Sequence, residues 1–167
     1  MMESLTFNRC SIEDLERVSI LAEEIWPISF AKILSPAQIE YMLEWMYSAD
    51  QLKTQFLSGH LFYLAKMDDI EVGFVGLEPN HPEMDHLRIH KIYLHPKHQG
   101  KKIGKWMTEQ VEVLAKNLKL KYLHLNVNRH NTAVDFYLKC GFKTIDTEDI
   151  DIGNGYFMND FIMRKKL

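Results

Sequence analysis

The sequence predicts an α+β protein built on a mixed, mostly antiparallel sheet. Periodic segments follow the order strand, three helices, three strands, helix, strand, helix and two strands, whereas a doubly wound parallel sheet needs regular alternation. The chain has 167 residues, of which 46% are hydrophobic and 26% are charged. These values are typical of a folded chain with a substantial core. We therefore expect one domain over residues 1–167.

The first 59 residues are predicted to be mostly helical after a short strand at residues 5–8. Ser11 followed by Asp14 indicates a helix start, and apolar residues at helical spacing follow it. Ser35-Pro36 combines a cap with proline at the first helical position, which predicts a second helix. Asp50 is the expected cap of a third, short helix.

Strands dominate the remainder of the chain. Alternating residues predict strands at 60–66, 71–77, 86–94 and 121–128, and two more at 142–150 and 156–164. A long amphipathic helix is expected from Ile103 to Leu118, and a short one at 132–139 that ends at Gly141.

Composition and charge argue against several classes of protein. Cys10 and Cys140 are the only cysteines, too few for a disulfide framework, and we expect free thiols in the cytoplasm. Residues 1–10 lack the layout of a signal peptide, and no apolar run is long enough to cross a membrane. The net charge of −3 does not favour a nucleic-acid partner.

Residues 93–105 have the properties of an anion-binding segment. A strand ends, a turn rich in glycine and lysine follows, and a long helix begins at once. Helix N-termini carry free N–H groups and partial positive charge, so a pyrophosphate suits this position. The spacing from Gly100 to Gly104 is one residue too short for a nucleotide P-loop, and Trp106 stands where that loop needs serine or threonine. Alone, the segment is equally compatible with a solvated basic turn.

Two motifs resemble those of the GCN5-related N-acetyltransferases. Residues 99–104, Q-G-K-K-I-G, resemble the cofactor signature Q/R-x-x-G-x-G/A, with Lys102 where the family usually has glycine. Residues 131–142, N-T-A-V-D-F-Y-L-K-C-G-F, are similar to the family's N-x-x-A-x-x-F/Y-Y-x-x-x-G-F. The resemblance covers residues 5–167.

The resemblance implies a six- to seven-stranded sheet flanked by helices, in which the central strand and the next parallel strand splay apart. It further implies that acetyl-CoA binds in this opening as cosubstrate, without a metal, and that acetyl passes directly to an amine. The residues implied in cofactor binding are Ile92, Tyr93, Leu94, Gln99, Gly100, Lys101, Lys102, Ile103, Gly104, Lys105, Asn131 and Tyr137.

Two of these residues also have ordinary structural explanations. Tyr137 matches the family's tyrosine near the CoA sulfur, where its hydroxyl would protonate the departing thiolate. It is otherwise a core tyrosine on a short helix. Asn131 matches the asparagine that contacts the pantetheine arm, and it is otherwise the N-cap of the helix that follows it.

Two residues are candidates for the general base that takes the proton from the amine. Some relatives place a glutamate where this chain has Asn126, so that base is absent. By the period of a strand, Arg88, His90 and Ile92 should share one face, which makes His90 the first candidate. Glu78, at the end of the preceding strand, is the second, and a water chain is the alternative to both.

Histidines alone do not indicate a metal site here. The chain has eight, but no acidic or cysteine partners stand near them at the spacing of structural zinc sites. We therefore expect no metal.

Residues 26–30, 41–47 and 51–52, together with the tail from 153 to 163, resemble the bacterial polyamine N-acetyltransferase subgroup. The acceptor predicted from this resemblance is a small cationic amine such as spermidine or spermine. Acidic residues expected around it are Glu23, Glu24, Glu40, Glu44, Asp146, Glu148, Asp149 and Asp151, and aromatic residues are Trp26, Phe30 and Tyr41. The alternatives are a protein N-terminal or lysine acetyltransferase and a non-catalytic CoA-binding regulatory module. A homodimer is also expected.

Overall fold

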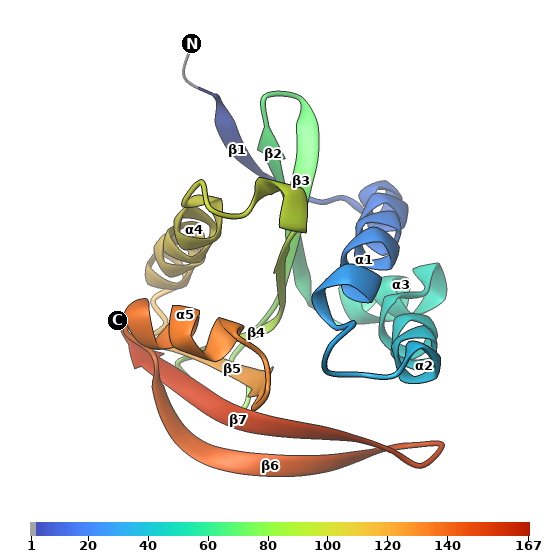
Figure 1. The fold of residues 1–167 in the computed structure, drawn as a ribbon. Coiled ribbons are helices and arrows are strands. Elements are labelled where there is room, and N and C mark those ends of the chain that lie inside the picture. Colours follow the sequence, from blue (N-terminus) through green and yellow to red (C-terminus); the bar gives the residue numbers. More distant parts are fainter. Residues whose placement is uncertain (1–2) are drawn as a thin grey trace.

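A computed structural model describes residues 3–167, and all seven strands of this part form one sheet (Figure 1). The strands are β1 Leu5–Arg9, β2 Leu61–Met67, β3 Ile70–Pro79, β4 His86–Leu94, β5 Tyr122–Asn128, β6 Lys143–Gly153 and β7 Tyr156–Lys166. Their order is β1-β2-β3-β4-β5-β7-β6, and only β4 and β5 pair in parallel. The predicted mixed, mostly antiparallel sheet is confirmed.

Helices cover both faces of the sheet (Figure 1). The helices are α1 Leu15–Ser29, α2 Pro36–Tyr47 and α3 Ala49–Leu57 on one face, and α4 Ile103–Asn117 and α5 Ala133–Lys139 on the other. Ser35 accepts a hydrogen bond from the Gln38 N–H, as predicted for the start of α2. Ser48, rather than the predicted Asp50, caps α3, because its hydroxyl accepts from the Gln51 N–H. Among the described residues, no helix is long and apolar enough to span a membrane.

Each face of the sheet has its own hydrophobic core. On the α4 side, Val111 and Met107 pack against strand residues such as Leu123 and Leu125. On the α1–α3 side, an aromatic group that includes Trp26 and Tyr47 packs against the other face of β2, β3 and β4. The two cores hold the middle of the sheet rigidly between two helical layers.

The central pair of strands separates after a short common stretch. β4 and β5 pair through four residues each, from His86 opposite Tyr122 to Ile89 opposite Leu125. Within residues 3–167, the remaining parts of the two strands do not pair with each other: β4 continues along β3 and β5 along β7. The expected splayed pair is therefore confirmed, and it leaves backbone hydrogen-bonding groups on two facing strand edges without strand partners.

A β-bulge changes which residues of β4 face which layer. Leu77 lies opposite Ile89, but Gly76 lies opposite Lys91, so His90 is an extra residue on the β4 side. Ile92 packs into the core on the α4 side, whereas His90 contacts Glu78 on the opposite face. The prediction that Ile92 shares a face with Arg88 and His90 is wrong, because strand periodicity breaks at a bulge.

The β6–β7 hairpin extends beyond the sheet and docks on α2 (Figure 1). The Tyr41 hydroxyl donates to the Ile152 carbonyl at 2.7 Å, and the Gln38 amide donates to the Phe157 carbonyl at 3.1 Å. Gly153, at φ +85°, turns the hairpin, and a Cβ there would lie 2.9 Å from the Tyr41 hydroxyl. Both the backbone conformation and the close approach require glycine at this position.

The β-bulge at His90 also places the next residue, Lys91, in the interior of the protein. Lys91 is 6% exposed, its ammonium donates to Gln55 Oε1 at 2.9 Å, and it lies 5.2 Å from the centre of the Tyr47 ring. Burial lowers the pKa of Lys91 to about 8 from its usual 10.5. The folded protein therefore holds this proton less tightly than the unfolded chain does.

We predict that Lys91→Met stabilises the protein at pH 7 and that the gain shrinks as pH rises from 8 to 10. Below pH 8 both states carry the charge and the folded state bears its burial cost, on the order of 3 kcal/mol for this pKa difference. Between pH 8 and 10.5 the unfolded chain binds more protons, so wild-type stability rises with pH relative to the variant. Denaturant unfolding at several pH values measures this difference, and a gap independent of pH would contradict it.

Candidate active site

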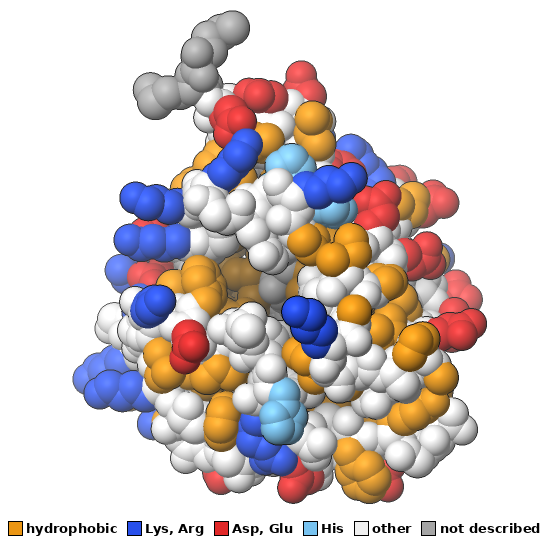
Figure 2. Space-filling model, viewed as in Figure 1, with side chains coloured by type: hydrophobic (Ala, Val, Ile, Leu, Met, Phe, Trp, Pro, Cys, Tyr) orange, Lys and Arg blue, Asp and Glu red, His pale blue; other side chains and the backbone are white. Residues whose placement is uncertain are grey.

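Four elements meet where β4 and β5 separate. The facing edges of the two strands form two sides, and the starts of α4 and α5 lie beside them (Figure 1). Figure 2 shows that the surface is hollowed here, with hydrophobic side chains deep in the hollow. The opening therefore offers backbone hydrogen-bonding groups at the base of an accessible depression.

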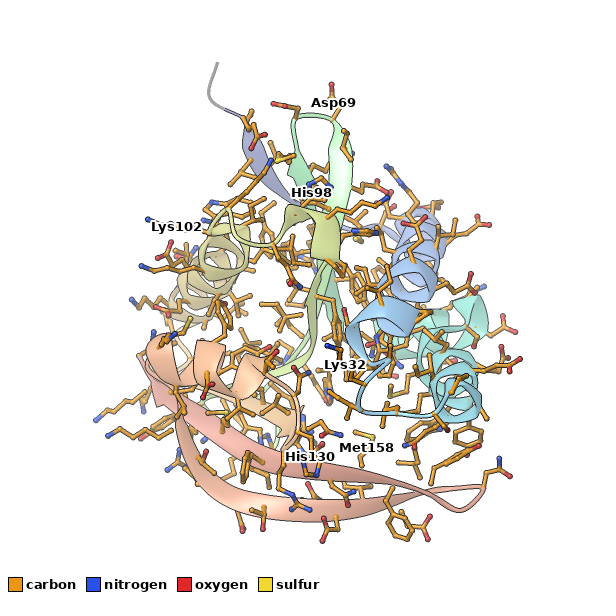
Figure 3. All side chains as sticks on the ribbon, viewed as in Figure 1. Lys32, Asp69, His98, Lys102, His130 and Met158 are labelled. Atoms are coloured by element: carbon orange, nitrogen blue, oxygen red, sulfur yellow. The ribbon has the colours of Figure 1, made fainter. Side chains whose placement is uncertain are left out.

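The turn before α4 contains two left-handed residues. Gly100 has φ +83° and Lys102 has φ +62°, and Ile103 then begins the helix. The family signature usually has glycine where Lys102 stands, and the structure explains that preference, since a left-handed residue other than glycine costs about 1–2 kcal/mol. Lys102 nevertheless keeps the same turn and lies at the N-terminal end of α4 (Figure 3).

The turn presents charge and free N–H groups next to the opening. The first N–H groups of α4 have no acceptor within the helix. Lys101 pairs with Glu3 at 3.0 Å, and the Lys105 ammonium lies 3.9 Å from the Glu109 carboxylate. These ion pairs are exposed and weak, so the lysines can turn toward an anion.

The side chains of Ile103 and Tyr93, both in the implied cofactor set, pack into the two cores, so these residues offer their backbone to a ligand. Ile103 is 2% exposed and packs in the core on the α4 side. The Tyr93 ring packs on the other side among Trp26, Phe30 and Tyr47. Trp26 and Phe30 are themselves only 2% and 5% exposed, so they are core residues rather than the predicted lining of an acceptor cleft.

Gly104 lies in the first turn of α4 against α5. A Cβ at this position would meet only Phe136 atoms, at 3.6 and 3.8 Å, which are ordinary contacts. Packing within the protein therefore does not demand glycine at residue 104, and the space beside it is open to a ligand.

Helix α5 carries Tyr137 and follows Asn131. Tyr137 is 8% exposed, its ring lies between Phe136 and Phe142, and burial raises its pKa above the usual 10. A raised pKa keeps the hydroxyl protonated at neutral pH. Thr132, rather than the predicted Asn131, is the N-cap of α5, and Asn131 Oδ1 accepts from the N–H of the first helical residue, Ala133, at 2.9 Å.

His90 and Glu78 are not rivals but hydrogen-bonded partners. His90 Nε2 lies 2.7 Å from Glu78 Oε2. His60 Nε2 lies 3.5 Å from the same oxygen, and His81 Nδ1 lies 3.8 Å from Oε1. The rings of His60 and His90 stack with their centres 4.9 Å apart. We call His60, Glu78 and His90 the His–Glu–His cluster.

Protonation in this cluster follows from burial and mutual contact. Burial lowers the pKa of His90 to about 4 and also lowers that of His60. Burial alone would raise the pKa of Glu78, but the hydrogen bond from His90 and the nearby histidines outweigh it and lower that pKa. At neutral pH the cluster therefore consists of neutral imidazoles around a carboxylate.

A second carboxylate group lies across β5 from the cluster. The Asn126 amide donates to Glu148 Oε2 at 3.1 Å and to Asp160 Oδ2 at 3.4 Å. Asp160 is 3% exposed, and burial raises its pKa. Asp160 and His60 were missed in the sequence, because no local pattern marks them and only the strand register places them.

Three of the predicted acidic residues lie away from the opening. Glu23, Glu40 and Glu44 line a groove of about 790 Å³ between α1 and α2, whose lining includes no residue of β4, β5, α4 or α5. Asp149 forms an ion pair with Arg129. Of the tail acids, Glu148 is the one held by a residue of the opening, Asn126.

Comparison with known proteins agrees with this geometry. The Acetyltransferase (GNAT) domain family matches residues 30–160. The chain is 32% identical to a spermidine N(1)-acetyltransferase of Thermoplasma acidophilum over 98% of each chain. It is 36% identical, over 64% of this chain and 68% of the relative, to the peptidyl-lysine N-acetyltransferase YjaB of Salmonella typhimurium.

A solved structure shares the whole fold. PaiA N-acetyltransferase from Thermoplasma acidophilum, crystallised in complex with coenzyme A, superposes with a TM-score of 0.80 at 31% identity, over 98% of this chain and 99% of that one. The chain therefore belongs to the GNAT acetyltransferase family and is an N-acetyltransferase.

We predict that the left-handed turn at residue 102 matters for acetyl-CoA binding more than the lysine charge does. Lys102→Gly and Lys102→Val both remove the charge, but only glycine adopts a positive φ freely. Calorimetry should show acetyl-CoA binding retained in the glycine variant and weakened in the valine variant. Equal affinities in two folded variants would contradict this.

Proposed function

We propose that the protein transfers acetyl from acetyl-CoA to a primary amine of a small cationic molecule, with spermidine or spermine preferred. The observation that carries the proposal is the β4–β5 opening beside the N-terminus of α4. The carboxylates of Glu78, Glu148 and Asp160 lie on the strands to either side of it. The spermidine N(1)-acetyltransferase relative supports the choice of acceptor.

The loop at residues 99–105 would hold the cofactor pyrophosphate. Its glycine, its lysines and the free N–H groups of α4 suit a doubly charged anion. The backbone groups of Ile92, Tyr93 and Leu94 on the open edge of β4 would pair with the pantetheine amides. Coenzyme A in the PaiA structure supports this assignment.

In the proposed reaction the amine nitrogen forms a bond to the acetyl carbonyl carbon, and the bond from that carbon to sulfur breaks. The nitrogen becomes acidic as it bonds, and neutral His90 takes its proton. Glu78 accepts a hydrogen bond from His90 Nε2–H, which leaves Nδ1 with the free lone pair, and it stabilises the imidazolium formed. Tyr137 gives its proton to the departing thiolate.

The acceptor preference follows from the carboxylates. Glu78 lies on β3, next to β4, and Asp160 and Glu148 lie on β7 and β6, beyond β5, where both contact Asn126. Carboxylates on one side of a cleft favour cations there. A molecule with a second ammonium would contact them while its primary amine reaches the acetyl group.

We predict that Tyr137→Phe lowers kcat by roughly 10²–10⁴ and leaves acetyl-CoA affinity unchanged, because it removes only the proton donor. Steady-state kinetics by thiol release and calorimetry of acetyl-CoA measure the two quantities. An unchanged kcat would assign protonation of the thiolate to water or another group.

We also predict that Glu148→Gln raises KM for spermidine about two- to fivefold, the value of one exposed ion pair, but not KM for propylamine. The glutamine keeps an acceptor for Asn126 and removes only the charge. Glu44→Gln, the same change in the α1–α2 groove, is the matched control and should alter neither KM.

The same assay separates the alternative functions. A panel of spermidine, spermine, propylamine and peptides with free N-termini or lysines should show the highest kcat/KM for the polyamines. Preference for a peptide would move the acceptor to protein, and acetyl-CoA binding without thiol release on any amine would favour a regulatory module.

A further inference from the structure

We propose that His60, Glu78 and His90, brought together from the start of β2, from β3 and from β4, bind a divalent transition-metal ion of the zinc and cobalt class. We further propose that this ion blocks acetyl transfer, and this second part rests on the function proposed above. Neither the motifs of the chain nor its relatives' names point to a metal.

The backbone already places the three ligands close together. His60 immediately precedes β2, Glu78 lies near the end of β3 and His90 lies in the bulge of β4. One ligand atom from each residue lies within 4.8 Å of the others. Because the backbones of β2, β3 and β4 fix where these residues stand, only their side chains must move to meet an ion.

The separations fit a metal after small side-chain movements. Glu78 Oε2 is 2.7 Å from His90 Nε2 and 3.5 Å from His60 Nε2. Ligands at about 2.0–2.1 Å in a tetrahedral zinc site lie roughly 3.3 Å apart. The contact with His90 must lengthen and that with His60 must shorten slightly, and the two stacked rings, 15° from parallel, must tilt so that both lone pairs point at one ion.

The donor set selects the class of ion. Two imidazole nitrogens and one carboxylate oxygen suit zinc, cobalt and nickel, whereas calcium and magnesium prefer oxygen ligands alone. Three protein ligands leave a fourth position for water, as in open zinc sites. His81 Nδ1 lies 3.8 Å from the other carboxylate oxygen of Glu78, Oε1.

The surroundings predict reversible binding rather than a permanent structural ion. A ligating histidine usually donates its second N–H to an acceptor, but His60 Nδ1 is buried and has no hydrogen-bond partner among residues 3–167. Loss of such a contact weakens metal sites by about 10–100-fold. Binding must also replace the hydrogen bond between His90 and Glu78.

An ion at this site would remove the proton acceptor. With the metal on His90 Nε2, the proton of the neutral ring resides on Nδ1, which then has no lone pair. The ion also occupies the Glu78 carboxylate that would stabilise the imidazolium. Metal binding and proton transfer therefore exclude each other at the same two side chains.

The binding test uses tag-free, chelator-treated protein without CoA, whose thiol would itself bind the ion. Cobalt(II) absorption in the visible range and zinc calorimetry should show one ion per chain. His60→Ala keeps the His90–Glu78 pair and should lower affinity about tenfold or more. His130→Ala, a histidine on the β5–α5 loop, is the matched control and should bind as wild type (Figure 3).

Circular dichroism and acetyl-CoA calorimetry confirm that each variant is folded. No ion bound by wild type, or equal affinity in folded His60→Ala, would overturn the site.

The activity test separates the two parts of the proposal. Zinc should inhibit wild-type thiol release reversibly by chelator, and His60→Ala should need a higher zinc concentration for the same fractional inhibition. Binding without inhibition would overturn the second part and the role of His90 as base, while the site stands. Failure of metal-free wild type to acetylate any amine would instead contradict the proposed function and leave the binding result intact.

Discussion

The separation of β4 from β5 after four paired residues is the constraint on which the rest of the structure depends. A sheet interior normally satisfies every backbone N–H and C=O by strand pairing, and here two facing edges lack that partner. The separation persists because each strand is held on its other side, β4 by β3 and β5 by β7, and because a separate core covers each face. Extended amides of a ligand can restore the missing bonds, and the N-terminus of α4 lies at the same place to receive an anion.

The sequence predicts the features that depend on neighbouring residues. All seven strands, the long helix from Ile103 and the cap at Ser35 follow from periodicity and local hydrogen bonding. The bulge at His90 could not be predicted, since an inserted residue looks like any other until the partner strand is known. For the same reason Glu78 and His90 stood as alternatives, although they form one hydrogen-bonded pair, and His60 was overlooked. Trp26 and Phe30 have aromatic rings suited to a substrate, but only burial shows that they belong to the core.

In the turn before α4, backbone conformation and charge favour different amino acids at residue 102. Glycine is favoured at residue 102 because φ is positive there, whereas lysine adds positive charge at a helix N-terminus that already attracts anions. The conformational cost of Lys102 is paid in the folded state, and its charge contributes only when an anion is near. Lysine in place of the usual glycine at residue 102 is therefore compatible with a left-handed residue just before α4.

The bulge joins the stability of the fold to the chemistry of the site. By adding one residue, it sends Ile92 into the core on the α4 side, whereas His90 contacts Glu78 on the opposite face. It also directs the Lys91 ammonium into the interior against Gln55 and Tyr47, where the charge is costly. A regular strand would put His90 and Ile92 on one face and Lys91 on the opposite one. The bulge thus places a costly buried charge beside the His90–Glu78 pair, and it holds because the cores on both sides of β4 stabilise the strand around it.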